Sequence, residues 1–146
     1  MTPDRAAIDE LRAAYAHCFG CGLGNPAGLQ LDGFEIENSG VTAPFHPTST
    51  FAGFEGVLHG GIVATALDEI SAWSAMLTEG VLVFTAKLDI RYRKQAGADT
   101  AFVLSGSVRE RRGKRLTIDA RMTDEGVTVA ESQGLFVAAQ NIDDLA

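Results

Sequence analysis

Cysteine, basic charge and long apolar runs are all scarce in this chain of 146 residues, and each scarcity excludes a class of protein. Two cysteines, Cys18 and Cys21, are too few for the disulfide framework of a small secreted domain. A net charge of −7 argues against general nucleic-acid binding, which normally requires a basic balance. No segment approaches the ~18 uninterrupted apolar residues of a membrane span, so we expect no membrane partner.

The composition predicts one globular domain over residues 1–146. Hydrophobic residues make up 46% of the chain, which is enough to build a core at this length, and the sequence contains neither a repeat nor a linker. The first residues lack a basic stretch followed by an apolar run. We therefore expect no secretory signal and a cytoplasmic protein.

Several motifs of enzymes and metal sites are also missing. No Gly-x-Ser-x-Gly occurs, and the three histidines stand in separate expected loops, so a nucleophilic triad is not indicated. Cys18-x-x-Cys21 lies in a glycine-rich loop, whereas a redox motif of this spacing opens a helix. A structural zinc site usually needs four protein ligands, and no second Cys or His pair has ligand spacing. We expect a structural role, no metal and no resident cofactor, with metal or redox chemistry as the less favoured alternative.

The stretch from Gly56 to Leu77 contains the features on which the predicted fold and function depend. After Ile62 it is rich in Ala and Leu without Gly or Pro, which predicts a helix over residues 62–77. Apolar residues occupy nearly every face of this helix, so the remaining chain must enclose it. Its only charges before Glu79 are Asp68 and Glu69.

The three residues before this helix, His59, Gly60 and Gly61, form a candidate site of their own. Glycines at a helix start let a ligand approach backbone N–H groups that lack an intrahelical partner and lie at the positive end of the helix dipole. An anion-stabilising helix start and the half-buried carboxylate of Asp68 therefore occur in one short segment. For Glu69 we expect a structural or partner-facing role, with catalysis as the less favoured alternative.

Six predicted strands flank this helix in the sequence, two before it and four after it. Thr2-Pro3-Asp4 predicts the cap of a short amphipathic helix that ends at about Ala16. Residues 29–36 and 41–45 predict a hairpin, and four strands with an alternating pattern follow Gly80. Because the turns between them are short, we expect consecutive strands to be antiparallel neighbours. A single sheet that buries an apolar helix must curl round it, which predicts an α+β fold.

With this order of elements, the chain resembles the hotdog-fold thioesterases, and within them the PaaI-like acyl-CoA thioesterases. The resemblance rests on Leu58-His59-Gly60-Gly61, on Asp68 nine positions after the histidine, on Thr85, and on Leu88-Asp89-Ile90-Arg91-Tyr92. The loop that begins Cys18-Phe19-Gly20-Cys21-Gly22 is similar to the N-terminal signature of one subset of these proteins. The implied fold is a curved antiparallel sheet of five to six strands wrapped round one long helix, with a short N-terminal helix.

The resemblance also implies an activity and a set of roles. It implies hydrolysis of an acyl-CoA thioester by a homodimer or a dimer of dimers with sites at the subunit interface. Gly60 would donate its N–H to the thioester carbonyl, Gly61 would permit close approach, and His59 would hold the loop or polarise the carbonyl. Asp68 would be the nucleophile or the general base, and Thr85 would orient the attacking water. Many relatives carry Asn or Gln six residues before the histidine, where this chain has Gly53.

Charge and aromatic residues suggest where the substrate binds. Nine of the twelve Lys and Arg residues fall between Lys87 and Arg115, on one strand and one hairpin, and a local basic surface on an acidic protein suits the phosphates of CoA. A solvated strand face is the alternative. The candidate substrate-binding residues are Arg91, Arg93, Arg112, Lys114 and Arg115, together with Phe51 and Phe54, which could line an apolar cavity or simply belong to the core.

The hypothesis favoured by the sequence is an acyl-CoA thioesterase acting on a small, medium-chain or aromatic acyl group. A thioester is already activated, so a donor for the oxyanion and one carboxylate meet the chemical need. The alternatives are a hydratase or dehydratase of acyl thioesters and a non-catalytic acyl-CoA-binding module.

Overall fold

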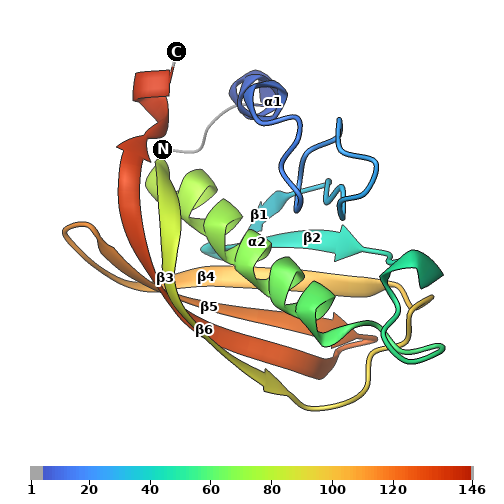
Figure 1. Ribbon diagram of the computed structural model, residues 1–146. Helices are drawn as coiled ribbons and strands as arrows, with labels where there is room; N and C mark the ends of the chain where they lie inside the picture. Colours follow the sequence, from blue (N-terminus) through green and yellow to red (C-terminus); the bar gives the residue numbers. More distant parts are fainter. Residues whose placement is uncertain (1–4, 146) are drawn as a thin grey trace.

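The computed structural model describes residues 5–145 (Figure 1). The predicted helix cap at residues 2–4 lies outside the described residues. The helices are α1 (Arg5–Ala14) and α2 (Gly60–Glu79), with short 3₁₀ turns η1 (Ser49–Phe51) and η2 (Ile142–Leu145). The strands are β1 (Glu35–Glu37), β2 (Gly40–Phe45), β3 (Val81–Tyr92), β4 (Phe102–Arg112), β5 (Arg115–Asp124) and β6 (Val127–Asn141).

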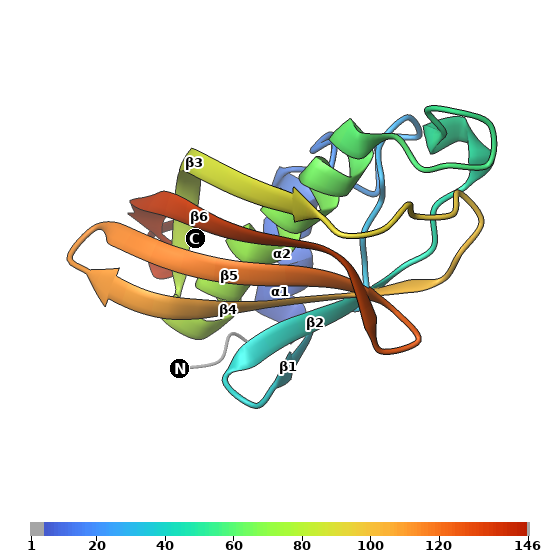
Figure 2. The ribbon, with the colours of Figure 1, turned by 90° about the horizontal axis from the view of Figure 1, so that it is seen from below.

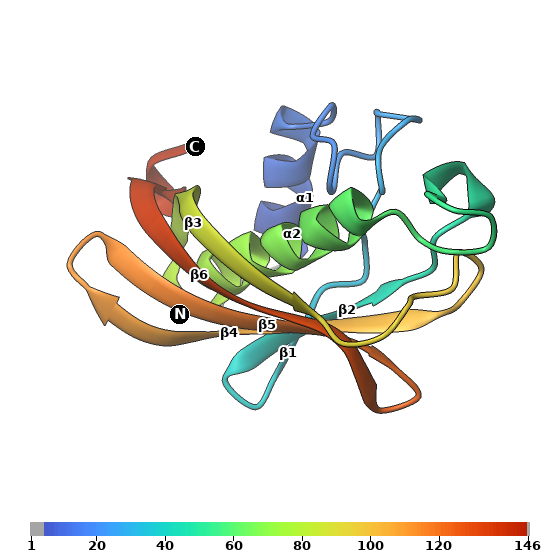
Figure 3. The same ribbon diagram turned by 60° about the horizontal axis from the view of Figure 1, so that its bottom comes forward.

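The six strands form one antiparallel sheet in the order β1-β2-β4-β5-β6-β3. The sheet curves round α2, and α1 lies on the side of α2 away from the sheet (Figures 1 and 3). Figure 2 shows the same sheet from below, with β3 and β1 at its two edges. The α+β prediction of one sheet wrapped round one helix, with a short helix at the N-terminal side, is confirmed.

The prediction that all consecutive strands are neighbours is wrong for β3 and β4. β3 pairs with β6 at one edge, whereas β4 lies between β2 and β5. The connection between them runs along the loop before α2, where the Leu58 N–H donates to the Ala96 carbonyl at 2.8 Å and Val57 forms a bridge to Gly97. The loop before α2 therefore supplies backbone partners to this longer connection.

Two predicted element boundaries also change. The strand expected over residues 29–36 is regular only from Glu35, because Leu29 and Leu31 leave the sheet and bury their side chains over the core. The central helix extends beyond the predicted 62–77 range at both ends and closes at Gly80, whose φ of 67° is left-handed. Within residues 5–145, no helix meets the length and hydropathy needed to cross a membrane.

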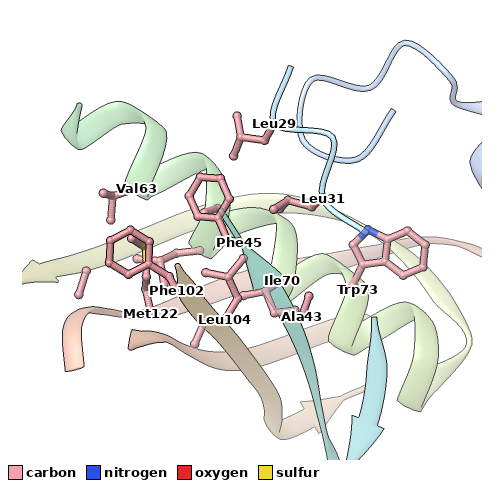
Figure 4. Packing of buried hydrophobic residues seen from close by; sticks show 14 of the residues in the cluster. Leu29, Leu31, Ala43, Phe45, Val63, Ile70, Trp73, Phe102, Leu104 and Met122 are labelled. Carbon is pink, nitrogen blue, oxygen red and sulfur yellow. The ribbon is translucent and has the colours of Figure 1, made fainter. Parts of the chain in front are cut away.

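The core fills the concave side of the sheet. Trp73, Ile70, Phe102 and Leu104 are at most 2% exposed, and Figure 4 shows side chains from α2 and the strands meeting there. Burying each such side chain stabilises the fold by about 1.5–3 kcal/mol. The Phe34 ring stacks on Trp73 with centroids 4.1 Å apart, so the segment before β1 also belongs to the core.

The outer edge of β3, on the side away from β6, has no neighbouring strand in the part of the chain that the structure describes. It is also apolar in places, since Phe84 is 72% exposed and Tyr92 is 54% exposed. A long exposed edge of this kind is a template for pairing with another strand.

Candidate active site

The start of α2 is organised by His59. Its Nδ1 accepts the Gly61 N–H at 2.8 Å, and its backbone carbonyl accepts the N–H groups of Ile62 and Val63. This capping bond requires an unprotonated Nδ1, so a neutral imidazole carries its proton on Nε2. Among the described residues, the Gly60 N–H has no hydrogen-bond partner and remains available to a ligand.

Tyr92 lies against Gly60, a contact that the sequence did not predict. The Tyr92 hydroxyl donates to the Gly60 carbonyl at 2.7 Å, and a side chain at position 60 would touch the tyrosine ring. A cavity of about 320 Å³ opens here, lined largely by apolar residues that include Val57, Val63 and Val129. The alternating pattern placed Tyr92 on a strand, but nothing in the sequence connected it with residue 60.

The Asp68 carboxylate is held by Thr85. The Thr85 hydroxyl donates to Asp68 Oδ1 at 2.6 Å across 17 positions of sequence. The pairing of β3 with β6 shifts register between Thr85 and Lys87, so Ala86 is an extra residue. A bulge of this kind changes which side chains face the helix, and it lets Thr85 reach Asp68 while Leu88 still packs inward.

The helix start and the Asp68–Thr85 pair lie apart within one chain. Gly60 and Asp68 are eight positions apart in α2, which corresponds to about 12 Å along the helix axis. Both groups must come within roughly 3 Å of one reacting thioester or its water. One chain therefore does not bring the predicted donor and carboxylate together.

Glu69, the neighbour of Asp68, lies in a different environment. Burial raises the pKa of the Glu69 carboxyl, and the charge of Asp68 raises it further, although a hydrogen bond with Cys21 opposes the change. Burial likewise raises the pKa of the Cys21 thiol, with the charge of Glu69 as the next cause. The expectation that Glu69 serves the structure agrees with this half-buried position beside the cysteines.

The predicted phosphate-binding residues fall into separate places. Arg93 lines the cavity beside Gly60 and pairs with Glu131, and this hydrogen bond lowers the pKa of Glu131. Arg91 lies in a broad polar hollow on another part of the sheet. The hairpin that carries Arg112, Lys114 and Arg115 lies at the end of the sheet remote from the start of α2 (Figure 1).

The lining of the cavity beside Gly60 includes neither of the two phenylalanines proposed for the acyl group. Phe51 packs partly against the core, whereas Phe54 is 84% exposed. Their assignment to acyl binding therefore stays a prediction. Gly53 lies directly against His59, with an added Cβ only 3.3 Å from the His59 Cα, so the amide found in many relatives would have to stand at this contact.

The family of the protein can now be stated. The Thioesterase superfamily model matches residues 55–131, a range that contains the helix start, Asp68 and Thr85. The chain belongs to this superfamily and has its hotdog fold.

Two curated proteins of similar sequence carry the name of acyl-coenzyme A thioesterase. Acyl-coenzyme A thioesterase THEM4 of Bos taurus is 27% identical over 137 residues, which cover 92% of this chain and 56% of the bovine protein. Acyl-coenzyme A thioesterase THEM5 of Homo sapiens is 30% identical over 98 residues, which cover 66% of this chain and 39% of the human protein. The chain spans about half the length, or less, of these relatives.

Solved structures agree on the fold. The E. coli PaaI protein from the phenylacetic acid degradation operon has a TM-score of 0.75 at 16% identity, covering 92% of this chain and 94% of PaaI. A hypothetical thioesterase protein of Streptococcus pneumoniae with coenzyme A has a TM-score of 0.68 at 21% identity, covering 75% of this chain and 91% of that one.

Proposed function

We propose that this chain is a thioester hydrolase that cleaves acyl-CoA into a free acid and CoA. The observation that carries the proposal is the Asp68 carboxylate, fixed by the Thr85 hydroxyl at 2.6 Å on a helix that begins with the unpaired Gly60 N–H. The names of THEM4 and THEM5 and the CoA-bound pneumococcal structure support acyl-CoA as the substrate class. The hydrolysis itself is proposed to need no cofactor.

The proposed chemistry uses two groups. Water attacks the thioester carbonyl carbon while Asp68 takes its proton, and the Gly60 N–H stabilises the oxyanion, a donor worth about 3 kcal/mol in known acyl-transfer sites. The C–S bond then breaks, and the departing thiolate of CoA takes the proton from Asp68. Thr85 holds one carboxylate oxygen, which favours Asp68 as a general base over direct attack on the carbonyl.

Labelled water separates these two roles of Asp68. In a single turnover in H₂¹⁸O, general-base catalysis places ¹⁸O in the product acid, because water attacks the thioester carbon. Attack by Asp68 would form a mixed anhydride, and water that opens it at the Asp68 carbonyl carbon would release an acid with an unlabelled oxygen and leave ¹⁸O on Asp68. Mass spectrometry of the acid after one turnover distinguishes the two outcomes.

We further propose that the active site is shared between two chains of a homodimer, alone or within a dimer of dimers. Gly60 and Asp68 are about 12 Å apart along one helix, but antiparallel pairing of two β3 edges about a two-fold axis would place the start of one α2 opposite the middle of the other. The exposed edge and its apolar side chains, including Phe84, support this pairing.

A mixed dimer tests the shared site. Asp68→Asn removes the carboxylate, and Gly60→Pro removes the N–H at a first helical position that accepts proline. The extended conformation of His59, with φ −60° and ψ 135°, is the one required before proline. If sites are shared, mixing the two inactive variants restores roughly half the activity per dimer, because one of its two sites is intact. No recovery in a confirmed heterodimer contradicts the shared site.

The acyl group is proposed to be small, medium-chain or aromatic, because the cavity of about 320 Å³ beside Gly60 is apolar and limited in size. A series of acyl-CoAs of varied length and aromaticity, followed by release of free thiol, tests both substrate class and size. Hydration of an enoyl-CoA without thiol release would indicate a hydratase. Tight binding of acyl-CoA without turnover would indicate a binding module.

A further inference from the structure

Cys18, Cys21 and Glu69 come together on the side of α2 covered by the N-terminal segment. Their sulfur and carboxylate oxygen atoms all lie within 4.8 Å of one another, and Cys18 Sγ is 3.8 Å from Glu69 Oε1. Cys21 is buried, and the other two are half-buried. The cysteines supply only two candidate ligands in the sequence, and the fold adds a third from a residue 48 positions after Cys21.

The spacing of these atoms suits a tetrahedral metal ion. Bonds of about 2.3 Å to sulfur and 2.0–2.2 Å to oxygen place neighbouring ligand atoms roughly 3.5–3.8 Å apart. The separation of 3.8 Å between Cys18 Sγ and Glu69 Oε1 is close to this range, and all the ligand atoms lie within 4.8 Å of one another. Two thiolates and one carboxylate are a donor set that zinc accepts more readily than magnesium or calcium, which prefer oxygen alone.

The loop that carries the two cysteines is held in place by its backbone. The Gly22 N–H donates to the Cys18 carbonyl at 2.8 Å, and the Leu31 N–H donates to the Gly20 carbonyl at 3.0 Å. Buried Arg12 donates to the Cys21 carbonyl at 2.9 Å. The loop therefore presents both sulfur atoms on a fixed backbone and does not depend on a ligand to order it.

Gly20, between the cysteines, leaves room for the carboxylate. A Cβ at position 20 would collide with the carboxylate end of Glu69, so this oxygen donor occupies the space that any other side chain would fill. The cluster also forms part of the wall of a cavity of about 390 Å³ between α1, α2 and β3. Water could reach a metal ion from that side.

We propose that Cys18, Cys21 and Glu69 bind one zinc ion, which joins the N-terminal loop to α2 and leaves a fourth coordination position toward the cavity. Binding displaces the thiol protons, so the site combines two negative sulfur ligands with one carboxylate around a dication. The site is separate from the Asp68–Thr85 pair. This proposal revises the expectation of no metal, which was based on two cysteines alone.

The test uses the whole chain, reduced and treated with a chelator, with Co²⁺ as a spectroscopic substitute for Zn²⁺. We expect one Co²⁺ per chain, a near-ultraviolet thiolate-to-cobalt charge-transfer band and the visible bands of tetrahedral cobalt. Added Zn²⁺ should displace the cobalt and abolish the bands. Absence of stoichiometric Co²⁺ binding by the reduced protein overturns the proposal, including the case in which the cysteines only form a disulfide on oxidation.

Matched variants identify the ligands. Cys18→Ser and Glu69→Gln should lose the cobalt bands, whereas Asp68→Asn and His17→Ala, each next to a ligand in sequence, should keep them. Loss of the bands in His17→Ala, or their survival in Glu69→Gln, contradicts the assigned ligand set. Because Asp68→Asn separates metal binding from hydrolysis, failure of the zinc site and failure of the proposed activity are distinguishable.

A measurement on the unmodified protein covers the case in which a variant does not fold. Zn²⁺ should slow alkylation of Cys18 and Cys21 by iodoacetamide and raise the melting temperature, and a chelator should reverse both effects. Alkylation at the same rate with and without Zn²⁺ would show that the thiols bind no zinc.

Discussion

Asp68 and Glu69 are neighbours in α2, yet they lie against different parts of the molecule. Asp68 accepts a hydrogen bond from Thr85 on the exposed edge strand β3, whereas Glu69 lies beside Cys18 and Cys21 under the N-terminal loop. Consecutive residues of a helix point about 100° apart, so one helix delivers two carboxylates to two unrelated surroundings. The carboxylate beside Thr85 is the proposed general base, and the carboxylate beside the two cysteines is a proposed metal ligand.

The largest expected difference between the two sides comes from removing each carboxylate in turn. Asp68→Asn should lower kcat/KM roughly 10²- to 10⁴-fold, the usual contribution of a general base. Glu69→Gln should leave kcat/KM near the wild-type value, because Glu69 contacts the cysteines and not Thr85. Steady-state thiol release measures both variants. Equal losses in the two would remove the functional distinction between these carboxylates.

Substitutions of Thr85 test the proposed role of Asp68 further. A hydrogen bond to a charged group contributes about 1.5–3 kcal/mol, so Thr85→Val should lower kcat by roughly tenfold or more. Thr85→Ser keeps the hydroxyl and should recover most of the lost rate. A rate that follows β-branching instead, with valine active and serine inactive, would mean that position 85 supports only the strand.

Neutralising the basic hairpin between β4 and β5 tests whether it binds the phosphates of the proposed substrate. Replacing Arg112, Lys114 and Arg115 together by Ala should raise KM for acyl-CoA several-fold with little change in kcat, because remote phosphate contacts are equally strong in the ground and transition states. The increase should shrink at high salt. Arg5→Ala, on α1, is the matched control and should change neither constant. An unchanged KM at low salt contradicts phosphate binding by the hairpin.

The smallest expected effect concerns the loop on the Glu69 side. The pKa of Asp32 lies below its ordinary value. Burial alone would raise this pKa, but the hydrogen bonds from the Gly33 N–H and from buried Arg12 lower it. The pair stabilises the fold above the unfolded-state pKa, about 3.9, and this contribution is lost as pH falls through the lowered folded-state value. Because Asp32 is half exposed, Asp32→Asn should cost less than about 1 kcal/mol at neutral pH.

Denaturant unfolding of wild type and Asp32→Asn at neutral and acidic pH measures this contribution. The difference between the two proteins should vanish in acid, where both side chains are uncharged. A constant difference across the pH range would show that the ion pair with Arg12 is not its cause. Thioesterase activity should be unaffected, since Asp32 pairs with Arg12 and takes no part in the Asp68–Thr85 contact.

Much of the fold could be predicted because it depends on local patterns. An apolar helix without Gly or Pro, preceded by His59-Gly60-Gly61 and followed by alternating strands, specifies one enclosed helix and a curled sheet. Asp68 was identified as one of the two charges in the middle of that helix, whereas Thr85 was identified only through the resemblance to the hotdog-fold thioesterases. The neighbours of β3 were not identified, because the length of a connection limits where the next strand can lie without choosing its partner.

The sequence by itself determined the element types, the apolar central helix and the candidate donors and carboxylate, since these follow from periodicity and residue chemistry within short windows. Only the tertiary structure decided which distant groups meet: Tyr92 with Gly60, Thr85 with Asp68 through a bulge, and Glu69 with the two cysteines. Each of these contacts joins different elements, so it depends on the curvature of the sheet round α2 and on the register of its strands, which no local pattern of residues encodes.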